Sequence, residues 1–325
     1  MTLRHYIILL QITVICGVLA IIGYRVFIQV PVTGSLPKNF AQHQSGSIYS
    51  TYFEPQASTT MDNRPAWADK SSRNTINLDT LNDRYDYPVE KPQDVFRIAV
   101  LGDSFAYGLY VDTDKNFAEL LEDHFAADAQ CSKKIEIINF GVPAYDIEFA
   151  AERFRLRAAK YHPDVVLWFT EAGDFQQVND IFQPLLRKHA ETLAPGVPFD
   201  FFNMPGDVLN TIWPKAREEA QALMTPEQML EREMAALKKF RADFNGSLIL
   251  FSIPPAMQGN NVRKALTGFA QNATNTTVIL DAVSPWDVTY QVLPDDPHPN
   301  ALGSRMIADA LAEKMIAMHL VPCTK

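Results

Sequence analysis

Metal-binding signatures are absent from this sequence. Its 325 residues include only three cysteines and seven histidines, and none of them stands in a Cys-x-x-Cys, His-Glu-x-x-His or similar paired spacing. Such pairs matter because they bring two ligands within reach of one ion. We therefore expect no metal and no other cofactor.

An excess of basic residues is also lacking. The chain has 29 Lys and Arg against 38 Asp and Glu, which gives a formal net charge of −9. Nucleic-acid binding requires a basic face, so a nucleic-acid partner is not expected. The same charge balance fits poorly with adhesion to an anionic membrane surface.

Uncharged apolar sequence is concentrated at the N-terminus. Tyr6 to Gly23 comprise 18 residues without a formal charge, between Arg4 and Arg25. With the apolar residues that follow, this run approaches the roughly 20 residues that span a bilayer. It favours an uncleaved anchor over residues 6–30, with the N-terminus inside and the remainder exported. The alternative is a secretory signal cleaved near Ala20.

The organisation of the remaining chain follows from its periodicity. Residues 1–30 form a cytoplasmic tip and anchor in this interpretation, and 31–95, without sustained periodicity, a spacer and lead-in arm. Residues 96–325 have the pattern of one α/β domain. Within it, 175–225 lack strand signals and indicate an insertion, either a lid or substrate wall or an irregular loop.

Short apolar runs alternate with amphipathic segments in the predicted domain. The expected strands are Ile98–Leu101, Ile135–Asn139, Asp164–Phe169, Ser247–Ser252 and Val278–Asp281. The expected helices are 117–125, 147–161, 226–244 and 301–318. This alternation predicts a parallel sheet with helices on both faces.

The segment from Arg97 to Gly108 carries the strongest chemical signal. An apolar strand runs into Gly102-Asp103-Ser104, followed by an aromatic residue. Gly102 permits a sharp turn, and Ser104 then lies beyond the carboxyl end of a central strand, where open α/β sheets bind ligands. The alternative is a strand-to-helix turn in which Asp103 or Ser104 only caps the helix.

A second polar motif stands near the C-terminus. Asp295 and His298 are three residues apart on a Pro-punctuated turn. An aspartate that holds the imidazole Nδ1–H leaves Nε2 free to accept a proton from a serine. Ser104, His298 and Asp295 are therefore candidates for nucleophile, base and orienting acid.

These motifs together resemble the SGNH (GDSL) hydrolase family, in its membrane-anchored cell-envelope type. Asn139-Phe140-Gly141-Val142-Pro143-Ala144 is similar to the family's second block. The resemblance implies a three-layer α/β/α sandwich with a flavodoxin-like, five-stranded parallel sheet. It also implies an oxyanion hole formed by the backbone N–H groups of Ser104 and Gly141, with Asp103 structural near the site.

The third family block departs from the pattern. Family members carry an asparagine whose side chain donates to the oxyanion, and Gly173 occupies that position here, followed by Asp174. Asp174 is expected to be structural, as a helix N-cap. Loss of one oxyanion donor costs about 2.7–4 kcal/mol of barrier, so Gly173 indicates either a substitute donor or a slow enzyme. Asn179 is the nearest alternative donor.

The resemblance implies a serine ester hydrolase that removes a small acyl group, expected to be acetyl, from an envelope or exopolysaccharide sugar. One alternative is an O-acyltransferase that uses the same triad. Another is a weakened carbohydrate-binding or assembly protein, suggested only by Gly173. The expected partners are an acylated small molecule or polysaccharide, and the membrane through residues 6–30. The catalytic domain is then periplasmic or extracellular.

Two cysteines fall in the predicted exported part. Cys131 precedes the second predicted strand and Cys323 follows the last predicted helix, whereas Cys16 lies in the apolar segment. In an oxidising compartment a bond between Cys131 and Cys323 would pin the C-terminal tail. Two free thiols are the alternative.

Overall fold

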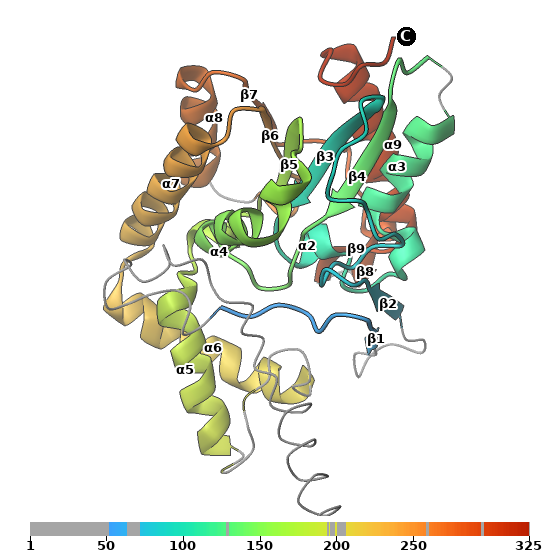
Figure 1. Ribbon diagram of the computed structural model, residues 1–325. Coiled ribbons are helices and arrows are strands. Elements are labelled where there is room, and N and C mark those ends of the chain that lie inside the picture. The colour runs from blue at the N-terminus through green and yellow to red at the C-terminus, as the bar shows by residue number, and fades with distance from the viewer. Residues whose placement is uncertain are drawn as a thin grey trace, which may run out of the picture. The chain divides into compact units, whose positions relative to one another are not determined.

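A computed structural model describes residues 52–63, 72–127, 130–193, 195, 199, 206–257, 260–293 and 296–324 (Figure 1). The anchor predicted at residues 6–30 lies outside this part of the chain. Among the described residues, no helix is both long and apolar enough to cross a bilayer.

A five-stranded parallel sheet forms the centre of the fold. Its strands are β3 (Val95–Leu101), β4 (Lys134–Asn139), β5 (Val165–Phe169), β6 (Ser247–Phe251) and β7 (Thr276–Ile279). They run in the order β4-β3-β5-β6-β7, which is the flavodoxin-like order 2-1-3-4-5. The predicted parallel sheet is confirmed, and the chain reverses its direction of travel across the sheet between β3 and β5.

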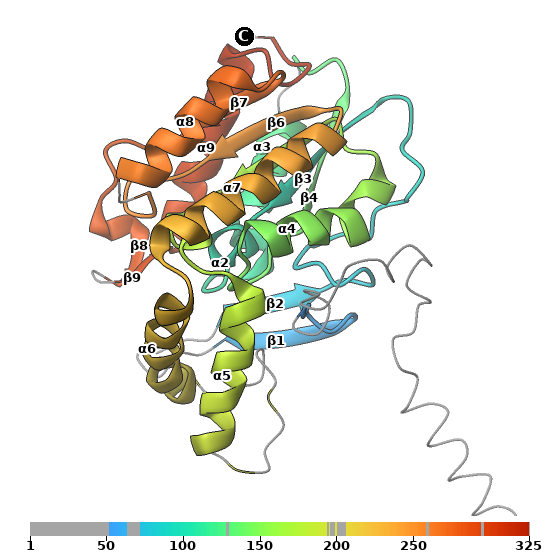
Figure 2. The same ribbon diagram turned by 90° about the vertical axis from the view of Figure 1, so that its left-hand side faces the viewer.

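Helices cover both faces of this sheet (Figures 1 and 2). One face packs against α3 (Phe117–Ala127) and α9 (Ala301–Ala317). The other packs against α4 (Ile147–Arg153), α7 (Pro226–Asp243) and α8 (Asn260–Asn272). The result is the three-layer α/β/α arrangement.

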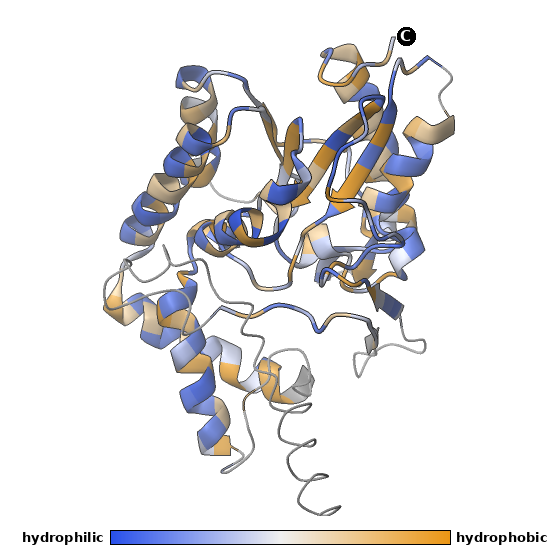
Figure 3. Cartoon of the chain, viewed as in Figure 1, coloured by the Kyte–Doolittle hydropathy of each residue, from blue (hydrophilic) through white to orange (hydrophobic). Residues whose placement is uncertain are grey.

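Alternation along β3 explains why the sheet is covered twice. Ile98 and Val100 belong to the core that α3 and α9 complete, and Ala99 and Leu101 belong to the opposite core. Successive side chains of a strand point to opposite faces, so a strand with two covered faces reads as a continuous apolar run. In Figure 3 the central strands are accordingly coloured mostly as hydrophobic.

Helix boundaries differ from the sequence prediction in one region. The single helix expected over 147–161 ends as α4 at Arg153 and continues as a π-helical turn, Phe154–Ala158, and a 3₁₀ turn, Ala159–Tyr161. The apolar period persists through these turns because Ala158 and Tyr161 stay buried. Helix α8 had no counterpart among the expected elements.

The interval 175–225 contains two helices, α5 (Asn179–Leu193) and α6 (Gly206–Leu223), that pack on each other. Together they build a small core of their own that includes Phe182, Leu186 and Ile212. The insertion is therefore helical and has its own hydrophobic cluster, and it is not an irregular loop.

The lead-in region contains an antiparallel hairpin, β1 (Thr59–Asn63) and β2 (Ser72–Ile76). The chain that follows reaches the short helix α2 (Ser104–Tyr107), since the Asn82 side-chain amide donates to the Tyr107 carbonyl at 2.7 Å. The Asn74 amide likewise donates to the carbonyl of Val111 at 2.9 Å. This segment supports the loop that carries Ser104.

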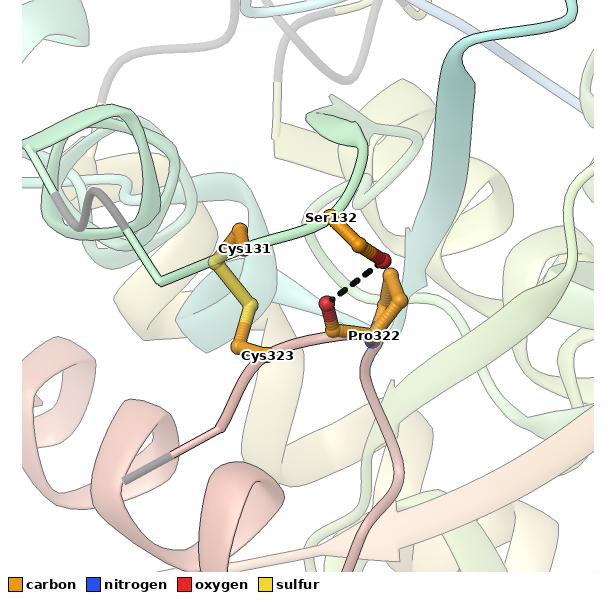
Figure 4. The surroundings of a disulfide bond; sticks show 4 residues. All are labelled: Cys131, Ser132, Pro322 and Cys323. Carbon is orange, nitrogen blue, oxygen red and sulfur yellow. Dashed lines mark hydrogen bonds between the residues drawn. A yellow bond between two sulfur atoms is a disulfide. The ribbon is translucent and has the colours of Figure 1, made fainter.

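Cys131 and Cys323 form a disulfide across 192 residues of sequence (Figure 4). Beside it, the Ser132 backbone N–H donates to the Pro322 carbonyl at 2.9 Å, and the Ser132 hydroxyl donates to the same oxygen at 3.2 Å. The C-terminal tail is thereby held against the chain that enters β4. Of the two alternatives given by the sequence, the bond between Cys131 and Cys323 is the one present.

Candidate active site

Ser104 lies at the carboxyl edge of the sheet, directly after β3. Gly102 has φ +137°, and a Cβ on it would lie 2.9 Å from the Phe169 carbonyl oxygen, so glycine is required by backbone and space together. The Asp103 carboxylate accepts the N–H of Phe105 at 2.9 Å and caps α2. Asp103 therefore has the structural role expected of it, and Ser104 is partly exposed at the first position of the helix.

Ser104 and His298 are brought together across 194 residues of sequence. The Ser104 Oγ lies 2.7 Å from His298 Nε2. His298 stands on β9 (Asp296–Pro299), which pairs with β8 (Gln291–Leu293) in an antiparallel hairpin. The structure therefore brings these two predicted residues within hydrogen-bond distance.

The acid that orients His298 is Asp296. Its Oδ1 lies 2.6 Å from His298 Nδ1 and accepts the His298 backbone N–H at 3.0 Å. The assignment of this role to Asp295 is thus corrected, and Asp295 itself lies outside the described residues. In a strand, residues i and i+2 share a face, and this places Asp296 beside the imidazole.

The surroundings of Asp296 favour its carboxylate form. Burial raises the pKa of this carboxyl, but the hydrogen bonds and positive charge of His298 outweigh burial and hold the pKa below its usual value. Asp296 is therefore charged at neutral pH and can stabilise an imidazolium.

Aromatic rings fix the orientation of the imidazole. Phe105 stacks on His298 with ring centroids 4.4 Å apart, and Tyr110 meets it edge-on at 5.1 Å. Phe105 in turn stacks on Phe169 of β5 at 4.8 Å. These ring contacts restrict rotation of the imidazole, whose Nε2 lies 2.7 Å from Ser104 Oγ.

The Gly141 N–H is already used within the protein, which corrects its predicted oxyanion role. It donates to the Asn139 side-chain oxygen at 3.0 Å. Glycine is needed here for a different reason. A Cβ on Gly141 would lie 2.5 Å from the Tyr107 backbone nitrogen and 2.7 Å from the Ala106 carbonyl carbon. Gly141 therefore allows the second block to approach α2.

Ala144, in the same loop, presents a better donor. The N–H groups of its neighbours Val142 and Tyr145 are bonded to backbone carbonyls, whereas the Ala144 N–H has no acceptor within the described chain. Ala144 is partly exposed and has φ +64°, uncommon for a residue other than glycine. Its carbonyl is held by the Asn179 side-chain amide at 2.7 Å. The Asn179 amide therefore supports this loop and is committed to it.

Gly173 is accounted for by Glu171. A Cβ on Gly173 would lie 2.4 Å from Glu171 Oε1, so the Glu171 carboxyl occupies the space that a side chain at 173 would fill. The φ of Gly173 is not positive, so backbone strain does not explain the glycine. Asp174 is not an N-cap as predicted. It lies inside the 3₁₀ turn Gly173–Phe175 and accepts the Glu171 N–H at 2.9 Å.

Three carboxyl groups gather beside Ser104. Asp103, Glu171 and Asp174 each offer an oxygen within 4.8 Å of the others, and theirs is the one such trio of potential metal ligands in the described chain. Burial, followed by the neighbouring carboxylates, raises the pKa of Asp103 and Asp174 well above the usual value, and burial raises the pKa of Glu171.

A cavity of about 490 Å³ opens beside this cluster. Glu171 and Gly173 line it from the end of β5, and Arg217 and Gln221 line it from α6. Gln291 completes the wall from β8, in the same hairpin as His298. Amide, guanidinium and carboxyl groups dominate this lining, so the cavity suits a ligand with many hydrogen-bonding groups.

Neither a family model nor a curated protein matches this chain. Among solved structures, it is similar to the esterase EstA from Pseudoalteromonas sp. (18% identity, TM-score 0.41, covering 69% of this chain and 98% of that one). It is also similar to a lipase/acylhydrolase from Enterococcus faecalis (16%, 0.39, 71% and 99%). A third is a catalytic mutant of the acetylxylan esterase Axe2 from Geobacillus stearothermophilus (11%, 0.42, 68% and 94%).

Three residues of the site were missed by sequence reasoning. Asp296 precedes His298 by two residues, a spacing that strand alternation would have favoured had β9 been recognised. Ala144 has no side-chain signal, since its N–H and backbone angle carry the role. Glu171 follows an apolar strand, as ligand-binding residues of parallel sheets do, and this position was its available signal.

Proposed function

We propose that this protein is a serine ester hydrolase of the SGNH type, with Ser104, His298 and Asp296 as its triad. The observation that carries the proposal is the continuous hydrogen-bonded chain from Ser104 Oγ through His298 to Asp296, with distances of 2.7 and 2.6 Å. A serine in contact with an imidazole that is oriented by a carboxylate is the arrangement that acyl transfer requires.

In the acylation step, Ser104 Oγ attacks the ester carbonyl while its proton moves to His298 Nε2. Asp296 holds the Nδ1–H tautomer and stabilises the imidazolium that forms. When the tetrahedral intermediate collapses, the bond to the leaving alcohol breaks and His298 returns the proton to its oxygen. The product is an acyl ester on Ser104.

Deacylation repeats the same proton transfers with water. His298 removes a proton from the water that attacks the acyl carbonyl, and then returns it to Ser104 Oγ. The negative oxygen of each tetrahedral intermediate needs hydrogen-bond donors. The backbone N–H of Ser104 and the N–H of Ala144 are the donors we assign to it.

The substrate we propose is a sugar that carries a small acyl group, such as acetyl. The cavity, which Pro297 next to His298 helps to line, supports this proposal because side chains such as Gln221 and Arg217 can bond hydroxyl groups. The disulfide is of the kind that persists in oxidising compartments. It supports export of this domain, with residues 6–30 as the proposed anchor.

The test is hydrolysis of 4-nitrophenyl acetate by the full chain in detergent. Ser104→Ala is expected to lower kcat by about 10⁴-fold or more, since both covalent steps need the hydroxyl. Its melting temperature should change little, because Ser104 is partly exposed. Substantial hydrolysis by Ser104→Ala would contradict the assignment.

A further inference from the structure

The loop that carries Ala144 is held by the start of helix α5. The Asn179 side-chain amide donates to the Ala144 carbonyl at 2.7 Å, and the Gln177 amide donates to the same oxygen at 3.2 Å. The Asn179 backbone N–H donates to the Asp146 carboxylate at 2.6 Å, and this carboxylate also caps α4. The side chain of Asn179 is fully buried, so water does not compete for these bonds. The helical insertion is therefore joined to the loop at two places.

The same loop is a tight turn that lies against the end of β3. The Val142 N–H donates to the Gly102 carbonyl at 3.1 Å, and the Val142 carbonyl accepts the Tyr145 N–H at 3.3 Å. Pro143 and Ala144 are the two central residues of this turn. Proline keeps its own φ negative, so the positive φ of Ala144 identifies a type II turn.

The angle at Ala144 decides where its N–H points. The N–H belongs to the peptide between Pro143 and Ala144, and this peptide is turned by about 180° between a type II and a type I turn. Glycine is the residue that suits the third position of a type II turn, and alanine by itself favours negative φ. A residue persists at such an angle only where its surroundings hold it there. The bonds from Asn179 and Gln177 restrain Ala144 on its carbonyl side, and Val142 restrains it on the other.

We propose that Asn179, assisted by Gln177, is a positioning residue for the oxyanion hole. It holds Ala144 at a positive φ and so keeps the Ala144 N–H directed at the oxygen that becomes negative when Ser104 attacks. This inference rests on the proposed ester hydrolysis. The Asn179 amide acts through Ala144 and does not itself bond the oxyanion, so the bonds that form and break at the ester are unchanged.

The test measures hydrolysis of 4-nitrophenyl acetate by Asn179→Ala in the full chain in detergent. We expect kcat to fall by about 10- to 100-fold with little change in KM, because the bond to the oxyanion forms in the transition state. The fall is smaller than the roughly 100- to 1,000-fold effect of losing a whole donor, since the N–H is still present. Addition of Ala144→Gly should rescue most of the lost kcat, because glycine adopts a positive φ without external support.

Gln183→Leu is the matched control. Gln183 is a buried amide one turn further along α5, and it donates to Asn179 Oδ1 at 3.2 Å instead of to the loop. Its substitution should lower the melting temperature and leave kcat within a few-fold of the parent. Gln177→Leu removes only the longer of the two bonds to Ala144, so a smaller fall in kcat with the same rescue is expected. This variant decides the question if Asn179→Ala does not fold.

Two results would overturn the inference and leave the proposed function intact, since the parent would still depend on Ser104. One is a kcat that does not fall in Asn179→Ala, or a fall that Ala144→Gly does not rescue. The other is an equal fall in Gln183→Leu, which would assign the effect to the stability of α5. A parent chain that neither hydrolyses the ester nor depends on Ser104 would overturn both proposals.

Discussion

Asp295 and Asp296 are chemically identical neighbours, and which of them orients His298 depends on backbone direction. Asp296 shares a strand face with His298 and accepts both its Nδ1–H and its backbone N–H. The sequence prediction placed the orienting aspartate three residues before His298, on a turn. In the β8–β9 hairpin, the aspartate that contacts the imidazole is two residues before it.

At this scale we expect Asp296→Asn to lower kcat by about 10⁴-fold, because the amide favours the wrong imidazole tautomer. Asp295→Asn is the natural comparison, with kcat expected within a few-fold of the parent. Steady-state hydrolysis of 4-nitrophenyl acetate measures both. If the two variants exchanged their effects, Asp295 would be the orienting acid and the strand argument would be wrong.

The two site glycines illustrate how an absent side chain is explained by its neighbours. Gly141 is small because the backbone of α2 lies against it, and Gly173 because the Glu171 carboxyl occupies its side-chain space. Both looked like chemical features in the sequence, one as a donor and the other as a missing donor. Gly141 is instead a packing requirement, because backbone atoms lie against it, whereas the nearest atoms at Gly173 belong to the Glu171 side chain.

Among the elements, helices α5 and α6 stand out because they form the cavity wall and have a core of their own. Arg232 of α7 bridges this pair to the sandwich, donating to Asp180 of α5 and to Glu148 of α4 at 2.6 and 2.7 Å. Arg217 and Gln221 project from α6 into the cavity lining. The positions of these two side chains therefore depend on the packing of α6 against α5.

Phe182→Ala should expose this dependence. Phe182 is buried on α5 and contacts Trp213 of α6 with ring centroids 4.8 Å apart. Its truncation is expected to cost about 3–5 kcal/mol of stability in the helical pair. KM for an acetylated oligosaccharide should rise while hydrolysis of 4-nitrophenyl acetate, which does not need the wall, changes little. Leu193→Ala, at the exposed end of α5, is the control. Equal effects on both substrates would contradict the view that the cavity wall of α5 and α6 contacts only the oligosaccharide.

Several carboxyl groups are buried in the part of the chain that the structure describes. Burial raises the pKa of Asp146 to about 7, and also that of Glu119 to about 7. Asp146 connects the site loop to the sandwich, accepting the N–H groups of Phe149 and Asn179. Such groups couple the stability of the fold to pH.

We expect the melting temperature to fall by about 5 °C or more between pH 4 and pH 7. Below about pH 4 these acids are protonated in both the folded and the unfolded chain. As the pH rises towards 7, the unfolded chain loses its protons first and is favoured. Above pH 7 the buried acids ionise in the folded chain as well, and their contribution to its stability is then fully lost. Thermal unfolding at pH values across this range measures the change in melting temperature. Asp146→Asn should make the melting temperature depend less on pH. A melting temperature that rises steadily from pH 4 to pH 7 would contradict this account.

The sequence by itself determined the sheet and the position of Ser104 at its edge. Runs such as Ile98–Leu101 are apolar on both faces, and a strand of this kind can only be buried between two layers of helices. Gly102 before Ser104 is a second local signal, because a positive φ at the end of such a strand needs glycine. These signals are local, so they could be found without coordinates.

Tertiary structure alone decided the groups that complete the site. Ala144 matters through an N–H that has no acceptor among the described residues, and Glu171 lies beside Gly173 and two other acids. The choice of Asp296 likewise required the pairing of β9 with β8. Each of these roles depends on which groups meet in space and on which hydrogen bonds are already made. Residue type and spacing do not encode those contacts.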